Sequence, residues 1–286
     1  MMYKVLNSDQ LLELFANLRD GLPGTAKIFY TVRHMLKGLL PNFECLVDKW
    51  PNWTCIVLRP EANKEVPQFF ENSYICHTNS ASSLKYFLQR PGVIDWTKSA
   101  NFSGIPYDLI AVTKEFARKL GGKFECREPH IMYAWCEAVS LDMPSHIPEG
   151  FILDTLKKSD IPMVFKHWKS SLSEHKGIYD YFETIITNFE NSCLRDNATS
   201  EVVAYTCRKF NGSISMIYVQ PKHRRKGFCH IVFADIMQKI IDNGDIPFGF
   251  LATNSKELIE TARKHHFTWV PQSNMTWATY EMTRPF

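Results

Sequence analysis

The sequence lacks any long uninterrupted apolar run. No stretch approaches the ~18 residues that a membrane-spanning helix needs, so we expect no membrane span. It also lacks an excess of charge of either sign, because 33 Lys and Arg residues stand against 30 Asp and Glu residues. The formal net charge of +3 indicates no general affinity for nucleic acid or for acidic membranes, so any basic site has to be local.

Cysteine pairs with metal-site or redox spacing are missing as well. The eight cysteines include no C-x-x-C pair and none stands beside histidines at ligand spacing, so we expect mostly buried, reduced thiols and no metal. The first 20 residues have no basic segment followed by an apolar run, and they carry Asp9, Glu13 and Asp20. A cleavable signal or transit peptide is therefore not predicted, which leaves the cytosol or an organelle reached by an uncleaved signal.

What is present is typical of a folded protein. Of the 286 residues, 45% are hydrophobic and 22% are charged, which excludes disordered and collagen-like chains. The length suits one large domain or two ordinary ones. Pro144, Pro148 and Gly150 punctuate a polar stretch, so we predict a linker at about 142–150 between an N-terminal domain over 1–145 and a C-terminal domain over 148–286.

Hydrophobic periodicity and turn residues predict helices and strands in both halves. Ser8 or Asp9 is expected to cap a helix over 8–20, and 26–35 has strand or helix character. No internal sequence repeat is evident. The fold class is α/β (α+β), with mixed sheets flanked by helices. Further helices are predicted over 82–89, 108–120, 160–169, 178–188, 228–242 and 255–265, and strands over 43–47, 54–58, 74–77, 131–135, 151–156, 193–196, 202–207, 213–219, 247–252 and 276–282.

Residues 213–229 form the segment that carries chemistry. Pro221 stops the predicted strand, a basic loop runs to Gly227, and an amphipathic helix begins at once. Free backbone N–H groups and the partial positive charge of a helix N-terminus bind anions such as phosphate, and a glycine allows close approach. A solvated charge patch or a nuclear localisation signal is the competing interpretation of the basic run. The countercharge would come from Lys222, Arg224, Arg225 and Lys226.

The pattern V-x-P-x-x-R-x-x-G between a strand and a helix resembles the acetyl-CoA-binding signature of the GNAT acyltransferase superfamily. Its residues here are Val219, Pro221, Arg224 and Gly227, and Cys229 replaces the customary third small residue. Downstream, residues 250–267 look like the next strand and helix of that superfamily.

Motifs in both halves narrow the resemblance to the glycine N-acyltransferase family. The segment Leu46-Val-Asp-Lys-Trp-Pro-Asn-Trp53 is similar to that family's N-terminal signature, and Tyr218-Val-Gln-Pro-Lys-His-Arg-Arg-Lys-Gly227 resembles its glycine N-acyltransferase-like members. Other matching positions are Leu22-Pro23, Lys27, Phe87-Leu88, Pro91, Ile94-Asp95-Trp96, His167-Trp168, Glu174, Phe189 and Cys193.

This resemblance implies an acyl-CoA-dependent N-acyltransferase that forms an N-acylglycine and coenzyme A. It implies a GNAT fold in the C-terminal half, a degenerate GNAT-like N-terminal half, a monomer, no metal, and a mitochondrial or cytoplasmic location. The backbone of 217–219 would pair with the pantetheine arm. The implied coenzyme A residues are Ile217, Tyr218, Val219, Arg224, Arg225, Lys226, Gly227, Phe228 and Cys229.

The expected catalytic position departs from the family. A glutamate proposed as the base in glycine N-acyltransferase stands at the position of Ser213, and a serine hydroxyl is a poor base, although it could orient a relay water. A weakly active or inactive acyl-CoA-binding protein is therefore the main alternative function. Protein lysine acylation stays open, whereas nucleic-acid binding rests on the basic loop alone. His223 and His230 are nearby histidines, and adjacent His265 and His266 do not share an ion easily on a helix.

Overall fold

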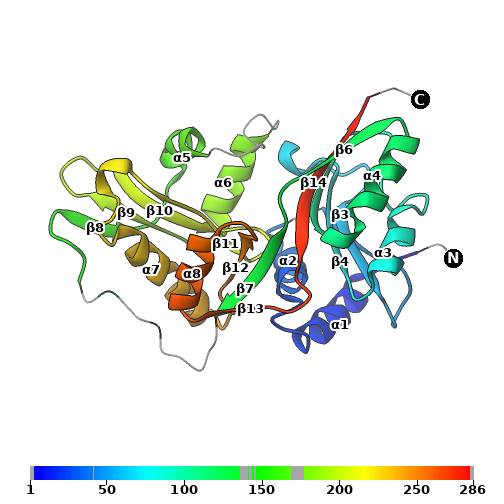
Figure 1. Ribbon diagram of the computed structural model, residues 1–286, viewed down its shortest axis with the longest axis horizontal. Helices are drawn as coiled ribbons and strands as arrows, with labels where there is room; N and C mark the ends of the chain where they lie inside the picture. Colours follow the sequence, from blue (N-terminus) through cyan, green and yellow to red (C-terminus); the bar gives the residue numbers. More distant parts are fainter. Residues whose placement is uncertain are drawn as a thin grey trace. The chain divides into compact units, whose positions relative to one another are not determined.

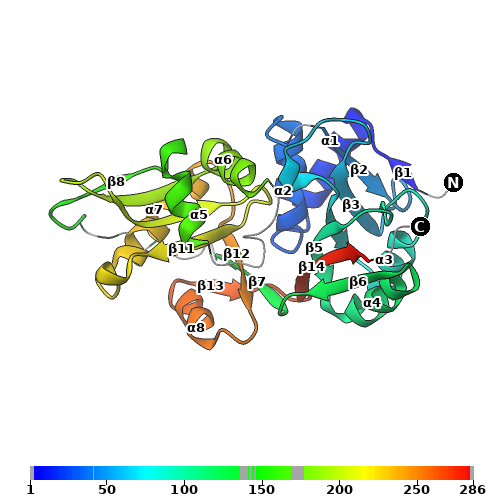
Figure 2. The same cartoon turned by 90° about the horizontal axis from the view of Figure 1, so that it is seen from above.

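The computed structural model describes residues 3–40, 42–135, 141, 144, 146–168 and 177–283. Two compact units are present (Figures 1 and 2). Unit 1 comprises Met1–Met132, Leu251–Ser255 and Val270–Phe286, and unit 2 comprises Tyr133–Phe250 and Lys256–Trp269. Each unit therefore contains chain from both sides of the predicted linker. The expected domain boundaries stay a prediction about sequence, and 142, 143 and 145 of that linker lie outside the described residues.

Unit 1 is a mixed sheet between two helix layers. Its strands follow the order β1-β2-β3-β4-β5-β14, and β6 pairs with the other edge of β14. The β4–β5 ladder is parallel, while the other ladders are antiparallel. Helices α1 and α2 lie on one face, and α3 and α4 on the other (Figure 1). The elements are β1 Lys4–Val5, α1 Ser8–Arg19, α2 Ala26–Leu36, β2 Phe43–Val47, β3 Cys55–Pro60, β4 Ser73–Thr78, α3 Ala81–Leu88, β5 Ala100–Pro106, α4 Ile110–Lys119, β6 Gly122–Cys126 and β14 Met275–Met282.

Unit 2 repeats this architecture. Its strands follow the order β7-β12-β11-β10-β9-β8, and β13 pairs with β7. The β11–β12 ladder is parallel and the β8–β9–β10–β11 run is antiparallel. Helix α7 packs on β9, β10 and β11, and α5 and α6 lie on the opposite face (Figure 1). The elements are β7 His130–Trp135, β8 Phe151–Asp154, α5 Ile161–His167, α6 Ile178–Asn188, β9 Asn191–Asp196, β10 Val202–Arg208, β11 Ile214–Val219, α7 Phe228–Asp242, β12 Phe248–Ala252, α8 Lys256–Lys264 and β13 Phe267–Trp269.

Both units use the same element order. Counted from β1 in unit 1 and from β8 in unit 2, a strand is followed by two helices, three strands, a helix, a strand, a helix and a strand. The sequence shows no repeat, because each position needs only the right hydrophobic pattern and not the same residue. The predicted mixed α/β fold class is confirmed, and 26–36 is a helix.

Three local predictions need correction. The cap of α1 is Asn7, whose Oδ1 accepts from the Gln10 N–H at 2.9 Å, and not Ser8 or Asp9. The sequence analysis missed β5 because Asn101, Ser103 and Gly104 read as turn residues, yet the strand is held between β4 and β14. Strands β1, β6 and β13 were also missed. They are short or exposed, and pairing rather than apolar content defines them.

Candidate active site

The candidate site in unit 2 begins where β11 leaves β12. Over the described residues of both strands, the parallel ladder registers one pair, Ile214 with Gly249. On its other edge, β11 pairs with β10, and three steps along β11 from Ser215 to Tyr218 match two along β10. This extra residue is a β-bulge, and Met216 has φ of 61°. The bulge bends β11, and its last five residues lie beyond the registered β12 pair.

The loop after β11 leads directly into the start of α7. A 3-10 turn over Pro221–His223 follows the strand, and Gly227 is the N-cap of α7 with φ of 81°. A Cβ added at Gly227 would meet nothing within 4 Å, so the backbone angle, and not crowding, favours glycine here. No side chain caps this helix and its first turn holds no acidic residue. Its first N–H groups are therefore available to an anion.

The basic side chains of the loop are exposed around this helix start. Arg224, Arg225 and Lys226 are all exposed, and Arg225 has φ of 62°. Arg224 Nε donates to the Val219 carbonyl at 3.2 Å, which places its guanidinium at the end of β11. Lys222 lies 3.4 Å from Glu201 and is partly neutralised by it. Three positive charges thus remain for a polyanionic ligand.

Phe228 anchors the helix start while Cys229 stays outside. Phe228 is 3% exposed and packs edge-on against Phe151, with ring centroids 4.7 Å apart. His223 stacks on Phe228 at 5.4 Å, which favours a packing role for this histidine. Among the seven described cysteines, Cys229 is exposed, Cys126 is half-buried and the other five are buried. The first turn of α7 is therefore anchored by the buried Phe228, while its Cys229 side is exposed.

Ser213 lies outside β11, in the turn that joins β10 to β11. It is 2% exposed, and its Oγ donates to Asn211 Oδ1 at 2.8 Å. Its backbone N–H binds the same oxygen at 3.2 Å. Arg208 Nε also donates to the Gly212 carbonyl in this turn. The hydroxyl is therefore committed to a local hydrogen bond rather than directed toward the bulge.

His167 is the last residue of α5, and its ring packs against β11; sequence reasoning named it for its family resemblance and not as a site residue. Its ring stacks on Tyr218 with centroids 4.0 Å apart and planes inclined by 13°. The Nδ1 atom is buried and has no hydrogen-bond partner among the described residues, and Nε2 is not enclosed in this way. Burial lowers the pKa of His167, and Lys166 lowers it further, against the opposing effect of Glu201. The ring is neutral at physiological pH.

The other histidines give no metal site. His230 stacks on His265 with centroids 5.1 Å apart, so both rings are engaged in packing. Within the described ranges, no group of three or more His, Cys, Asp or Glu side chains could hold a metal ion. Nor is any described helix long and apolar enough to span a bilayer.

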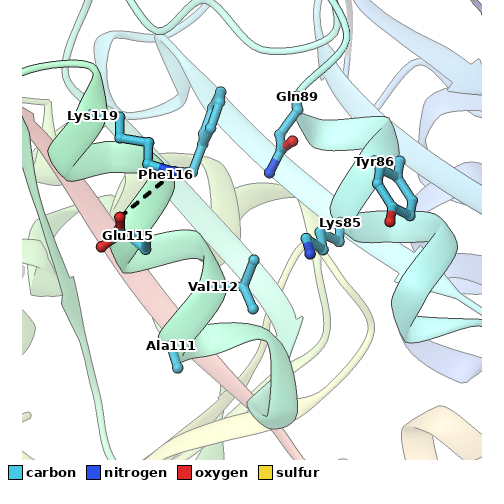
Figure 3. A pocket seen from close by; sticks show the side chains of 8 residues that line it. All are labelled: Lys85, Tyr86, Gln89, Ala111, Val112, Glu115, Phe116 and Lys119. Atoms are coloured by element: carbon cyan, nitrogen blue, oxygen red, sulfur yellow. Dashed lines mark ion pairs between the residues drawn. The ribbon is translucent and has the colours of Figure 1, made fainter.

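A hollow lies in unit 1, between α3 and α4. It has a volume of about 560 Å³, and Figure 3 shows Lys85, Tyr86 and Gln89 opposite residues of α4. Glu115 and Lys119 pair across one helical turn at its edge, 3.6 Å apart. The preceding helix start is already capped, since Ser80 Oγ accepts from the Ser83 N–H. Ser80 therefore caps α3 beside this hollow, whereas no side chain caps α4.

Known proteins are similar to this chain over most of its length. The family model described as aralkyl acyl-CoA:amino acid N-acyltransferase matches residues 2–190, and the FR47-like protein model matches 193–274. Glycine N-acyltransferase from Bos taurus is 26% identical over 242 residues, covering 78% of this chain and 81% of that protein. A glycine N-acyltransferase-like protein from Mus musculus is 26% identical, with 81% and 84% covered. Glycine N-phenylacetyltransferase from Bos taurus is 24% identical, with 85% and 87% covered.

Solved structures establish the fold. The X-ray structure of a Drosophila protein superposes with a TM-score of 0.81 at 14% identity, covering 99% of both chains. A tandem GNAT protein from the clavulanic acid biosynthesis pathway gives a TM-score of 0.51 at 13% identity and covers 99% of this chain and 98% of that one. The tandem GNAT fold is confirmed. Because the family model covers more than half of the sequence, the chain is an acyltransferase that belongs to the aralkyl acyl-CoA:amino acid N-acyltransferase family.

Proposed function

We propose that the protein transfers an acyl group from acyl-CoA to the amino group of glycine or a similar amino acid. The observation that carries this proposal is the bulged strand β11 followed by the open N-terminus of α7. The loop over 222–227 suits the phosphates of coenzyme A, and the free edge of β11 suits the amide groups of the pantetheine arm. Both features lie in unit 2, and the names of the relatives support the amino acid as acceptor.

The reaction follows from these positions. A neutral amine attacks the thioester carbon, a C–N bond forms, the C–S bond breaks, and the amine proton passes through solvent to the coenzyme A thiolate. A backbone N–H beside the Met216 bulge would stabilise the oxyanion. Ile217, whose side chain is 46% exposed, stands at this point. Ser213 is buried in its turn, so the chain supplies no carboxylate base at that position.

The alternative, a weakly active acyl-CoA-binding protein, rests on that observation. The test is release of free thiol with glycine across acyl-CoA donors of increasing length, beside calorimetry of coenzyme A binding. Amino-acid-dependent thiol release supports the transferase. Tight binding with no release for any donor or amino acid favours the alternative, and absence of both contradicts the whole assignment.

A further inference from the structure

His167 occupies a position that packing does not explain. Its ring covers Tyr218, one of the β11 residues expected along the pantetheine arm. Tyr218 in turn pairs in register with Tyr205, and these two rings lie 5.5 Å apart. A phenylalanine would fill such an aromatic stack equally well. The imidazole instead carries two nitrogens into it, one of them buried without a partner.

The burial of Nδ1 decides which nitrogen carries the proton. A buried N–H donor with no partner costs about 1–3 kcal/mol, and an unpaired lone pair is tolerated more readily. The neutral tautomer with hydrogen on Nε2 is therefore favoured. Protonation would put a second N–H at the enclosed Nδ1 position, which agrees with the lowered pKa. Consequently Nε2 is a hydrogen-bond donor and not a proton acceptor.

The surroundings of this donor favour an anion. Lys166 is exposed next to His167 on α5, and Lys209 Nζ lies 5.7 Å above the ring of neighbouring Trp168. Asp180 of α6 is exposed, and the following charges on nearby elements form ion pairs. Lys158 binds Glu183 of α6 at 2.6 Å, and Asp160 binds Arg195. Glu201 is the opposing acid, and it interacts with Gln220 and Lys222.

We infer that His167 Nε2 donates a hydrogen bond to the carboxylate of the amino acid acceptor. This inference rests on the proposed function. An α-amino acid holds its carboxylate one carbon away from the attacking nitrogen, so a group that binds it has to stand close to the thioester. His167 stands beside the β11 segment that follows the bulge, on the α5 face. It is a specificity residue that positions the amine by binding the carboxylate.

The experiment compares two variants with two acceptors. His167→Phe keeps the stack on Tyr218 and removes the donor, whereas His167→Gln keeps an N–H donor near Nε2. Glycine carries the carboxylate and glycinamide replaces it by a neutral amide. We expect His167→Phe to raise the KM of glycine about ten-fold, the range for a lost hydrogen bond to a charged group. The KM of glycinamide and the Kd of coenzyme A should stay unchanged, and His167→Gln should retain most of the glycine affinity.

Each other outcome overturns the inference. Equal losses with both acceptors, together with a shifted ascending limb of the pH profile, would make His167 a base. A lowered melting temperature with weaker coenzyme A binding in both variants would make it structural. If the unmodified protein conjugates no amino acid at all, the proposed function fails first and this inference with it.

Discussion

The two units have the same topology but differ at the parallel strand pair and at the start of the helix between its strands. In each, a central strand is followed by a helix and then by a parallel strand. In unit 2 the β11–β12 ladder registers one pair, and the helix start behind it is open. In unit 1 the β4–β5 ladder registers three pairs, and Ser80 caps the following helix. The same fold thus combines a short parallel ladder with an uncapped helix start in unit 2, and a longer ladder with a capped helix start in unit 1.

In unit 1, the buried side chain of Lys27 bridges the parallel strands β4 and β5. It is 2% exposed, and its Nζ donates to the carbonyls of Cys76 on β4 and of Ser103 and Gly104 on β5, at 2.6, 3.2 and 3.3 Å. A Cβ at Gly104 would lie 1.7 Å from Nζ, so this close approach requires glycine. The ammonium group thus binds carbonyls of both strands where the registered β4–β5 pairs end. Burial lowers the pKa of Lys27 to about 8.

The largest expected effect comes from adding a side chain at Gly227, the N-cap of α7 in unit 2. Gly227→Val places a β-branched residue at φ of 81°, which costs about 1–3 kcal/mol in backbone strain and disturbs the helix start. We expect coenzyme A affinity, measured by calorimetry, to fall about 100-fold. Gly244→Val is the matched control, because Gly244 also has positive φ and open space but lies at the far end of α7. Equal losses in both variants would contradict the assignment of the loop.

The second test removes the buried Lys27 of unit 1. Burial lowers the pKa of Lys27 from its ordinary value of 10.5 in the unfolded chain to about 8 in the folded one, so the unfolded chain binds more protons between these values. Stability from this group therefore rises with pH across that window. Relative to Lys27→Met, the free energy of unfolding of the parent should increase by about 2–3 kcal/mol between pH 8 and 10. Denaturant titrations at both pH values measure the difference.

Lys27→Met also sharpens the contrast between the units. We expect it to leave the Kd of coenzyme A unchanged, since the proposed phosphate site lies in unit 2. A pH-independent stability difference would show that folding does not lower the pKa of Lys27. Any marked change in coenzyme A binding would contradict the division of roles.

A smaller effect is expected from the charge of the loop. Arg225→Asn removes the guanidinium and tolerates the positive φ of this position better than alanine does. Coenzyme A affinity should fall about ten-fold, with a weaker dependence on salt. Lys85→Asn on α3 of unit 1 is the control and should change neither. Calorimetry at two salt concentrations checks both, and equal responses would contradict the assignment of the loop to the coenzyme A phosphates.

The smallest expected effect is at Ser213. Ser213→Ala removes the hydrogen bond to Asn211 and should cost about 1 kcal/mol of stability. We expect kcat with glycine to stay within about two-fold, because the hydroxyl is committed to its turn. A fall of kcat beyond about ten-fold, measured with thermal stability as a reference, would instead place Ser213 in proton transfer.

The sequence predicted what depends on neighbouring residues. The course of α7 from Phe228 to Asp242 agrees with its prediction to the residue, because strand end, Pro221, Gly227 and apolar spacing follow one another directly. The assignment of the loop residues to coenzyme A stays a prediction. Their position at the start of α7 follows from the order of strand, loop and helix in the sequence. Strand β5, by contrast, was missed because its turn-like residues become a strand only by pairing.

The sequence by itself therefore determined the fold class and the family, and it predicted a phosphate site in the loop before α7, because each of these depends on residues close together in the chain. Only the tertiary structure decided that a lysine bridges the parallel pair β4–β5 of unit 1. Lys27 binds the carbonyls of Cys76 and Gly104, which are 49 and 77 residues away in the sequence. It also placed His167 on Tyr218 and moved β14 into unit 1. Backbone geometry and capping act over a few residues, whereas ring stacking, burial and strand pairing depend on segments that meet only in the folded chain.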